Sequence, residues 1–160
     1  MPSLRELMIV ELDRVRVGFG EVGPSAVTVR SPVCGDEVTV EVRLSDGGDD
    51  GPVIRSLHWR GHGCTVSMAS ASALAGVAPG MTVAAFRAAN ESFGALVRGG
   101  EPSDELEAEF EAHPALGDAV AFTGIGRLPL RGGCATLAWG AVLTATTAPG
   151  TALSSPGSGA

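Results

Sequence analysis

The chain has 160 residues, a net charge of −7 and 11 basic residues, all of them arginine. This length suits one domain with a real hydrophobic core, and the acidic balance argues against a nucleic-acid or anionic-membrane surface, which would need clustered positive charge. No apolar run approaches the ~18 residues of a membrane span, and the charged residues near the N-terminus argue against a secretory signal.

Residues 3–16 are expected to form an N-terminal helix. Ser3 is a plausible cap, because Glu6 lies three residues further on and can complete a capping box. A set of apolar residues at helical spacing forms the face predicted to pack on the core: Leu4, Leu7, Met8, Leu12 and Val15.

Three runs that alternate apolar and polar residues, 25–31, 37–44 and 53–60, predict β-strands. An Asp/Gly-rich stretch at 45–52 is a strong loop signal between the second and third runs. Because the links are short, we expect an antiparallel meander with one face buried by helices.

After Cys64 the apolar period becomes helical, and Pro79 and Gly80 interrupt it. Further helices are expected over 81–97, 101–113 and 134–145, and the acidic charge of 101–113 is typical of a solvated helix face. Residues 1–145 are predicted to form a single domain. Residues 146–160, rich in Thr, Ala, Ser, Pro and Gly, are predicted to be a disordered C-terminal tail.

Each of the three cysteines stands beside a glycine, which lets the backbone turn tightly and come close to another group. Cys34, Cys64 and Cys134 are spaced 30 and 70 residues apart, which makes a poor disulfide framework. Reduced thiols in the cytoplasm are therefore the default.

Asp36 follows Cys34 by two residues, so both side chains can reach one metal ion across a glycine turn. Three thiolates and one carboxylate would make a tetrahedral zinc site. Cys64 and Cys134 fall where helices are expected to begin, and a helix N-terminus favours a thiolate. Because a carboxylate is a harder and more easily displaced zinc partner than a thiolate, this set would allow ligand exchange and release of a thiolate nucleophile.

Other interpretations of these residues stay open. Each cysteine alone is more often a small buried apolar residue than a ligand. His62 is an alternative ligand in place of Asp36, or an exposed loop residue. Arg131 could pair with Asp36 or bind a carboxylate of a partner, and Asp118 could cap a helix or accept hydrogen bonds from nearby amides.

The segments around the cysteines resemble those of the SufU/IscU family of iron–sulfur assembly proteins. Four segments match in order, 32–36, 61–72, 116–118 and 131–139, and they read PVCGD, GHGCTVSMASAS, LGD and RGGCATLAW. The long interval between the second and third cysteines, and the absence of a histidine just before Cys134, are similar to the SufU branch.

The resemblance implies an α+β fold in which a three-stranded antiparallel sheet packs against several helices. It implies zinc held by Cys34, Asp36, Cys64 and Cys134, with Arg131 supporting the site. It also implies a sulfurtransferase-like activity, in which Cys34 accepts persulfide sulfur from a pyridoxal-phosphate cysteine desulfurase of the SufS type. The sulfur would then pass to the iron–sulfur scaffold machinery.

Two other functions would use the same residues. One is a scaffold that assembles an iron–sulfur cluster on these ligands, and the other is a zinc-stabilised interaction module without chemistry. A colourless protein with one zinc would favour sulfur transfer or the module, whereas a brown chromophore would favour the scaffold.

Overall fold

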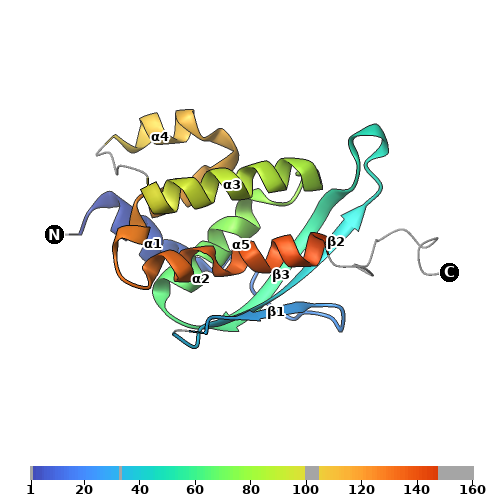
Figure 1. The fold of residues 1–160 in the computed structure, drawn as a ribbon, viewed down its shortest axis with the longest axis horizontal. Coiled ribbons are helices and arrows are strands. Elements are labelled where there is room, and N and C mark those ends of the chain that lie inside the picture. Colours follow the sequence, from blue (N-terminus) through green and yellow to red (C-terminus); the bar gives the residue numbers. More distant parts are fainter. Residues whose placement is uncertain (1, 33, 100–104, 148–160) are drawn as a thin grey trace.

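The computed structural model describes residues 2–32, 34–99 and 105–147. Figure 1 shows the elements, which follow one another along the chain as α1 (Leu4–Val15), β1 (Val27–Arg30), β2 (Glu37–Ser45), η1 (Gly48–Asp50), β3 (Val53–His62), α2 (Thr65–Val77), α3 (Val83–Gly99), α4 (Leu106–Ala112), η2 (Pro114–Phe122), η3 (Ile125–Arg127) and α5 (Arg131–Thr147). Within these described ranges no helix combines the length and apolar character needed to cross a membrane.

The sheet is the predicted antiparallel meander, with strand order β1-β2-β3. Val29 pairs with Val38, and Val40 pairs with Trp59 on the other side of β2. The valines of β2 and Leu44 are all buried, as their alternation predicts. Glu41 on the opposite face is also buried, and its carboxylate accepts a hydrogen bond from the Gly23 amide in the segment that precedes β1.

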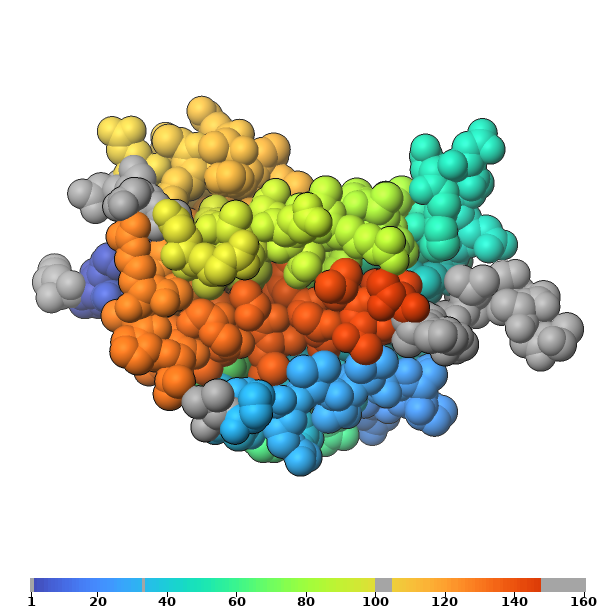
Figure 2. All heavy atoms as spheres, viewed as in Figure 1, coloured from blue at the N-terminus to red at the C-terminus, as the bar shows by residue number. Residues whose placement is uncertain are grey.

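Two helices, α2 and α5, bring the core onto one face of this sheet. Helix α5 packs against β1 and β2, and α2 packs against α5, β3 and α1. Helix α3 lies on the side of α5 away from the sheet, and Figure 2 shows α3 and α5 side by side with the β1–β2 hairpin against α5. The predicted α+β architecture is therefore confirmed.

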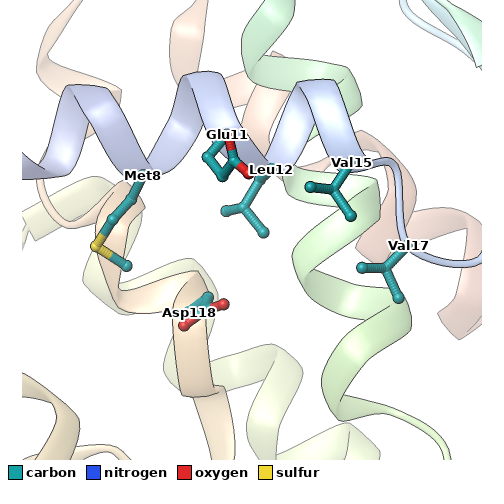
Figure 3. A pocket seen from close by; sticks show the side chains of 6 residues that line it. All are labelled: Met8, Glu11, Leu12, Val15, Val17 and Asp118. Atoms are coloured by element: carbon teal, nitrogen blue, oxygen red, sulfur yellow. The ribbon is translucent and has the colours of Figure 1, made fainter.

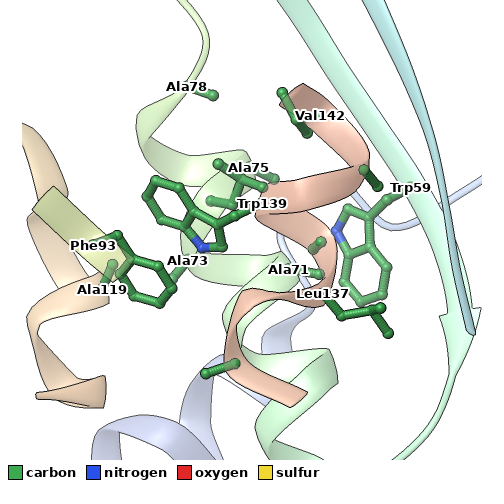
Figure 4. Packing of buried hydrophobic residues seen from close by; sticks show 14 of the residues in the cluster. Trp59, Ala71, Ala73, Ala75, Ala78, Phe93, Ala119, Leu137, Trp139 and Val142 are labelled. Atoms are coloured by element: carbon green, nitrogen blue, oxygen red, sulfur yellow. The ribbon is translucent and has the colours of Figure 1, made fainter. Parts of the chain in front are cut away.

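The centre of the core is built from two tryptophans and many alanines (Figure 4). Trp139 of α5 stacks on Phe93 with ring centroids 4.2 Å apart, and Phe86 lies on the same indole at 6.0 Å. Trp59 of β3 donates from Nε1 to the Val17 carbonyl at 2.7 Å, which ties the segment after α1 to the sheet. Small side chains along α2 allow this helix to be buried almost all round.

Helix α1 forms where it is predicted, and the Ser3–Glu6 capping box is present. The predicted core face, however, is wrong for most of its residues. Leu12 is buried and Met8 packs partly buried against the core, but Leu4, Leu7 and Val15 are exposed. The helix is instead oriented by Leu12 and by Arg5, whose Nη1 donates to the Val120 carbonyl at 2.8 Å.

Several boundaries differ from the prediction. Helix α5 begins at Arg131 rather than at residue 134, and it continues to Thr147, two residues beyond the expected end. Segment 114–122 is a 3₁₀ element that kinks at Gly117 (φ 50°). Of the predicted acidic helix, residues 106–112 are helical, and residues 101–104 lie outside the described ranges. The tail is predicted to begin at residue 146, but residues 146 and 147 belong to α5, and the rest of it lies outside the described ranges. The single domain over 1–145 stays a prediction.

Candidate metal centre

Cys34 and Asp36 lie in the tight connection between β1 and β2. The Ser31 amide donates to the Asp36 carbonyl at 2.8 Å, which closes the hairpin directly after the Arg30–Glu37 pair. Gly35 adopts φ 76°, a conformation that favours glycine. The turn leaves Cys34 exposed at its tip, whereas Asp36 at its base is only 6% exposed.

Cys64 is the N-cap residue of α2, as the sequence predicts. Its amide donates to Asp36 Oδ2 at 3.4 Å, so the start of α2 points at the carboxylate. Gly63 permits this approach, because a Cβ atom at that position would lie 2.6 Å from Asp36 Cγ. A larger residue at position 63 would therefore displace the Asp36 side chain.

Cys134 lies within the first turn of α5, not at its very start, and it is buried. Its Sγ atom lies 3.8 Å from Sγ of Cys34, although the two residues are 100 positions apart in the chain. Figure 2 shows the β1–β2 hairpin against α5, which is the contact that brings these two thiols together.

The ligand atoms of Cys34, Asp36 and Cys134 all lie within 4.8 Å of one another. Cys64 contacts the same group through its amide, and its thiol contributes to the raised pKa of Cys134, but its sulfur is not part of that compact set. The Cys64 thiol lies 3.7 Å from Ser67 Oγ on its own helix. All four predicted ligands therefore meet at one place, three of them more tightly than the fourth.

The charge states at this site follow from burial and hydrogen bonding. Burial raises the pKa of Asp36, but the hydrogen bonds from Ser67 and Cys64 outweigh burial, so the pKa lies below its usual value and the side chain is a carboxylate. Burial, together with the neighbouring thiols Cys64 and Cys34, raises the pKa of Cys134 to about 12. Burial therefore outweighs any stabilisation of the Cys134 thiolate by the helix N-terminus.

This donor set fits a soft or borderline metal ion. Thiolates bind zinc and iron–sulfur clusters in preference to hard cations. A buried thiol with so high a pKa gives up its proton at neutral pH only when a positive charge offsets the cost of burial, and a bound divalent ion supplies that charge. The carboxylate next to it adds a fourth donor that is already ionised.

Ser67 is the residue that sequence reasoning missed. It is fully buried in the first turn of α2, and its hydroxyl donates to Asp36 Oδ2 at 2.6 Å. Its position three residues after the N-cap places the hydroxyl on the side of the helix that faces the cap. That spacing from Cys64 is the sequence signal that would have pointed to it.

Arg131 and His62 take no part in the compact set. Arg131 is exposed at the start of α5, and among the described residues it forms no ion pair with Asp36, whose partners are Ser67 and the thiol residues. His62 is exposed at the end of β3 and is absent from the group of clustered ligand atoms. Of the two alternatives for Arg131, contact with a partner's carboxylate stays a prediction.

The chain is similar to known proteins of one family. The chain is 30% identical over 116 residues to the zinc-dependent sulfurtransferase SufU of Bacillus subtilis, covering 72% of this chain and 70% of that protein. It is 31% identical over 120 residues to the iron–sulfur cluster assembly scaffold protein IscU of Streptococcus pyogenes, covering 75% and 67%. The N-terminal NifU-like protein of Brucella abortus has the same fold, with a TM-score of 0.68, 24% identity and coverage of 85% of this chain and 87% of that one.

The model of the family described as NifU-like N terminal domain matches residues 16–127 of this chain. The match includes the first two cysteines, Asp36 and the Gly117 kink. Cys134 lies beyond that match, but the structure carries it back to the other two thiols. The fold, the cysteine segments and the relatives therefore agree, and the chain belongs to the NifU-like N-terminal domain family, in its SufU/IscU-like group.

Proposed function

We propose that this protein is a zinc-dependent sulfur acceptor, which takes persulfide sulfur from a pyridoxal-phosphate cysteine desulfurase and relays it for iron–sulfur cluster assembly. The relative from Bacillus subtilis, a zinc-dependent sulfurtransferase, supports the reaction class. The reduced thiols and the sulfur chemistry are suited to the cytoplasm.

The exposure of Cys34 carries the proposal. Cys34 is exposed at the tip of a glycine turn, whereas Cys64 is half-buried and Cys134 is buried. A persulfide held on another protein can reach only an exposed thiol, so Cys34 is the acceptor by access alone. Cys64 and Cys134 are anchored by helices, which suits residues that stay in place as ligands.

The residues that would hold zinc are Cys34, Asp36, Cys64 and Cys134. The ion would supply positive charge that keeps the thiols ionised at neutral pH. Ser67 and the Cys64 amide hold Asp36 in its ionised form and in place, so the carboxylate would remain available to the ion if the Cys34 thiolate were released.

The transfer needs no external oxidant or reductant. The Cys34 thiolate attacks the outer sulfur of the desulfurase persulfide, and a new S–S bond forms on Cys34. The S–S bond in the desulfurase breaks, and its electron pair leaves with the desulfurase cysteine as a thiolate. The sulfur keeps its oxidation state, and the acceptor now carries the persulfide.

The second candidate function is an iron–sulfur scaffold on the same ligands. It is favoured by the similarity to the IscU relative, a cluster assembly scaffold, and by the thiol set, which suits a cluster as well as zinc. Metal analysis of freshly purified protein separates the two. One zinc per chain supports the acceptor, whereas iron with acid-labile sulfide supports the scaffold.

The test of the acceptor assignment is direct. The zinc-loaded protein is mixed with a SufS-type desulfurase and cysteine, and intact-mass and peptide mass spectrometry locate the added sulfur. We expect a persulfide on Cys34, and we expect Cys34→Ala to abolish both the adduct and any stimulation of the desulfurase. Unchanged stimulation by Cys34→Ala would reject the assignment.

A further inference from the structure

A cavity of about 250 Å³ lies between α1 and η2, and none of the four predicted metal ligands lines it (Figure 3). Its lining combines apolar side chains with two carboxylates: Met8, Glu11, Leu12, Val15, Val17 and Asp118. Sites for small-molecule ligands usually measure about 300–1,000 Å³. The cavity is therefore of a size to accept one long side chain rather than a cofactor.

Asp118 is the uncommitted charge of this cavity. Its side chain is exposed, and within the described part of the chain it accepts no hydrogen bond and forms no ion pair, so it neither caps a helix nor binds nearby amides. The kink at Gly117 precedes it, where a Cβ atom would lie 2.8 Å from Val77 Cγ1. Glu11, by contrast, is held by Arg14 at 2.6 Å.

An apolar stripe on α1 extends from the cavity toward the N-terminus. Leu4, Leu7 and Val15 are 62%, 51% and 50% exposed. They share one face of the helix with Met8 and Glu11, at spacings of three and four residues. This is the face that helical periodicity marks as core, so its exposed leucines leave apolar surface available for contact with another molecule.

We propose that this surface binds an amphipathic segment of a partner protein and that the cavity receives one arginine or lysine side chain from it. The alkyl stem would lie along Met8, Leu12 and Val15, and the cationic head would meet Asp118. Apolar residues of the same segment would cover Leu4 and Leu7.

Charge complementarity favours a positively charged side chain on the partner. The only carboxylate of the cavity without an intramolecular partner is Asp118, among the described residues, and the chain as a whole carries −7. A cation on the partner would gain both from the local carboxylate and from this overall field. The leucines beyond the cavity favour a polypeptide over a free amine, because a small cation would leave them uncovered.

The probe is a pair of synthetic 16-residue amphipathic helices with a leucine face, identical except for one central arginine in the first and its neutral isostere citrulline in the second. Binding of both labelled peptides to the full chain is measured by fluorescence anisotropy. The variants are Asp118→Asn and Leu7→Ser, and the matched controls are Asp49→Asn and Leu128→Ser, which replace residues of the same type that are exposed but do not line the cavity.

We expect the wild-type chain to bind the arginine peptide roughly fivefold more tightly than the citrulline peptide, which is about 1 kcal/mol, the upper end for an exposed ion pair. Asp118→Asn should abolish that preference, and Leu7→Ser should weaken both peptides alike, with both controls unchanged. Equal binding of the two peptides to the wild-type chain, a preference that survives Asp118→Asn, or no saturable binding of either peptide would overturn the proposal. Saturable binding of n-butylguanidinium that ignores Leu7→Ser, without peptide binding, would assign the cavity to a small cation instead.

Discussion

Replacing Ser67 with alanine should weaken both the fold and the proposed zinc site. The hydroxyl is fully buried and donates the one short hydrogen bond to Asp36, at 2.6 Å, while the remaining amide donor of Cys64 stands at 3.4 Å. A hydrogen bond to a charged group contributes about 1.5–3 kcal/mol. Alanine recovers about 0.5 kcal/mol through its higher helix propensity, so the expected loss is about 1–2.5 kcal/mol.

That loss corresponds to a Tm lower by about 2–10 °C, at about 2–4 °C per kcal/mol for a chain of this size. Outer groups that orient metal ligands typically change metal affinity by about 10- to 100-fold, and we expect a decrease in this range for zinc. Stability is measured by chemical denaturation in the presence of a chelator, and zinc affinity by competition with a chromophoric chelator.

Ser72→Ala is the matched control. Ser72 is also fully buried on α2, but it accepts a neutral hydrogen bond from the Val17 amide at 2.9 Å, far along the helix from Cys64. Its loss should cost about 0.5–1.5 kcal/mol and should leave zinc affinity unchanged. Equal zinc affinities for the two variants would refute the view that Ser67 holds Asp36 for a metal.

Three further predictions concern the metal, the first helix and two glycines. Zinc at a thousandfold excess over its Kd should stabilise the fold by about 4 kcal/mol, so chelation should lower Tm by about 8–16 °C. An unchanged Tm after verified metal removal would show that the bound ion does not stabilise the fold. Arg5→Ala should cost about 1–3 kcal/mol in denaturant titrations, because it removes the part-buried hydrogen bond to the Val120 carbonyl and the ion pair with Glu109. Arg14→Ala, which removes a solvent-exposed ion pair with Glu11, should cost clearly less; equal costs would show that α1 is not anchored through Arg5. Gly63→Ala should displace Asp36 and reduce zinc affinity, because the added Cβ would collide with the Asp36 side chain. Gly133→Ala, with nothing within 4 Å of its Cβ, should leave zinc affinity unchanged and stabilise α5 by up to about 1 kcal/mol. A zinc titration in which Gly133→Ala binds more weakly than Gly63→Ala would contradict this reasoning.

Local patterns in the sequence were enough to predict the sheet and most helices. The alternation of β2 marks its buried valines, and Ser3 with Glu6 marks the start of α1, because pleat geometry and capping depend on residues close together in the chain. The residue types of Cys34, Asp36, Cys64 and Cys134 likewise pointed to one chemistry before any contact between them was known.

Contacts between distant segments decided the rest. Periodicity predicts that α1 has an apolar face, but whether Leu7 is covered depends on how the helix is rotated on α2 and η2, and a contact such as that of Arg5 with Val120 outweighs the pattern. The high pKa of Cys134 and the role of Ser67 arise in the same way, because burial and hydrogen bonding at these residues come from segments about 30 to 100 positions away. The residue type determines the chemistry of a side chain, whereas its burial and its hydrogen-bond partners depend on tertiary packing.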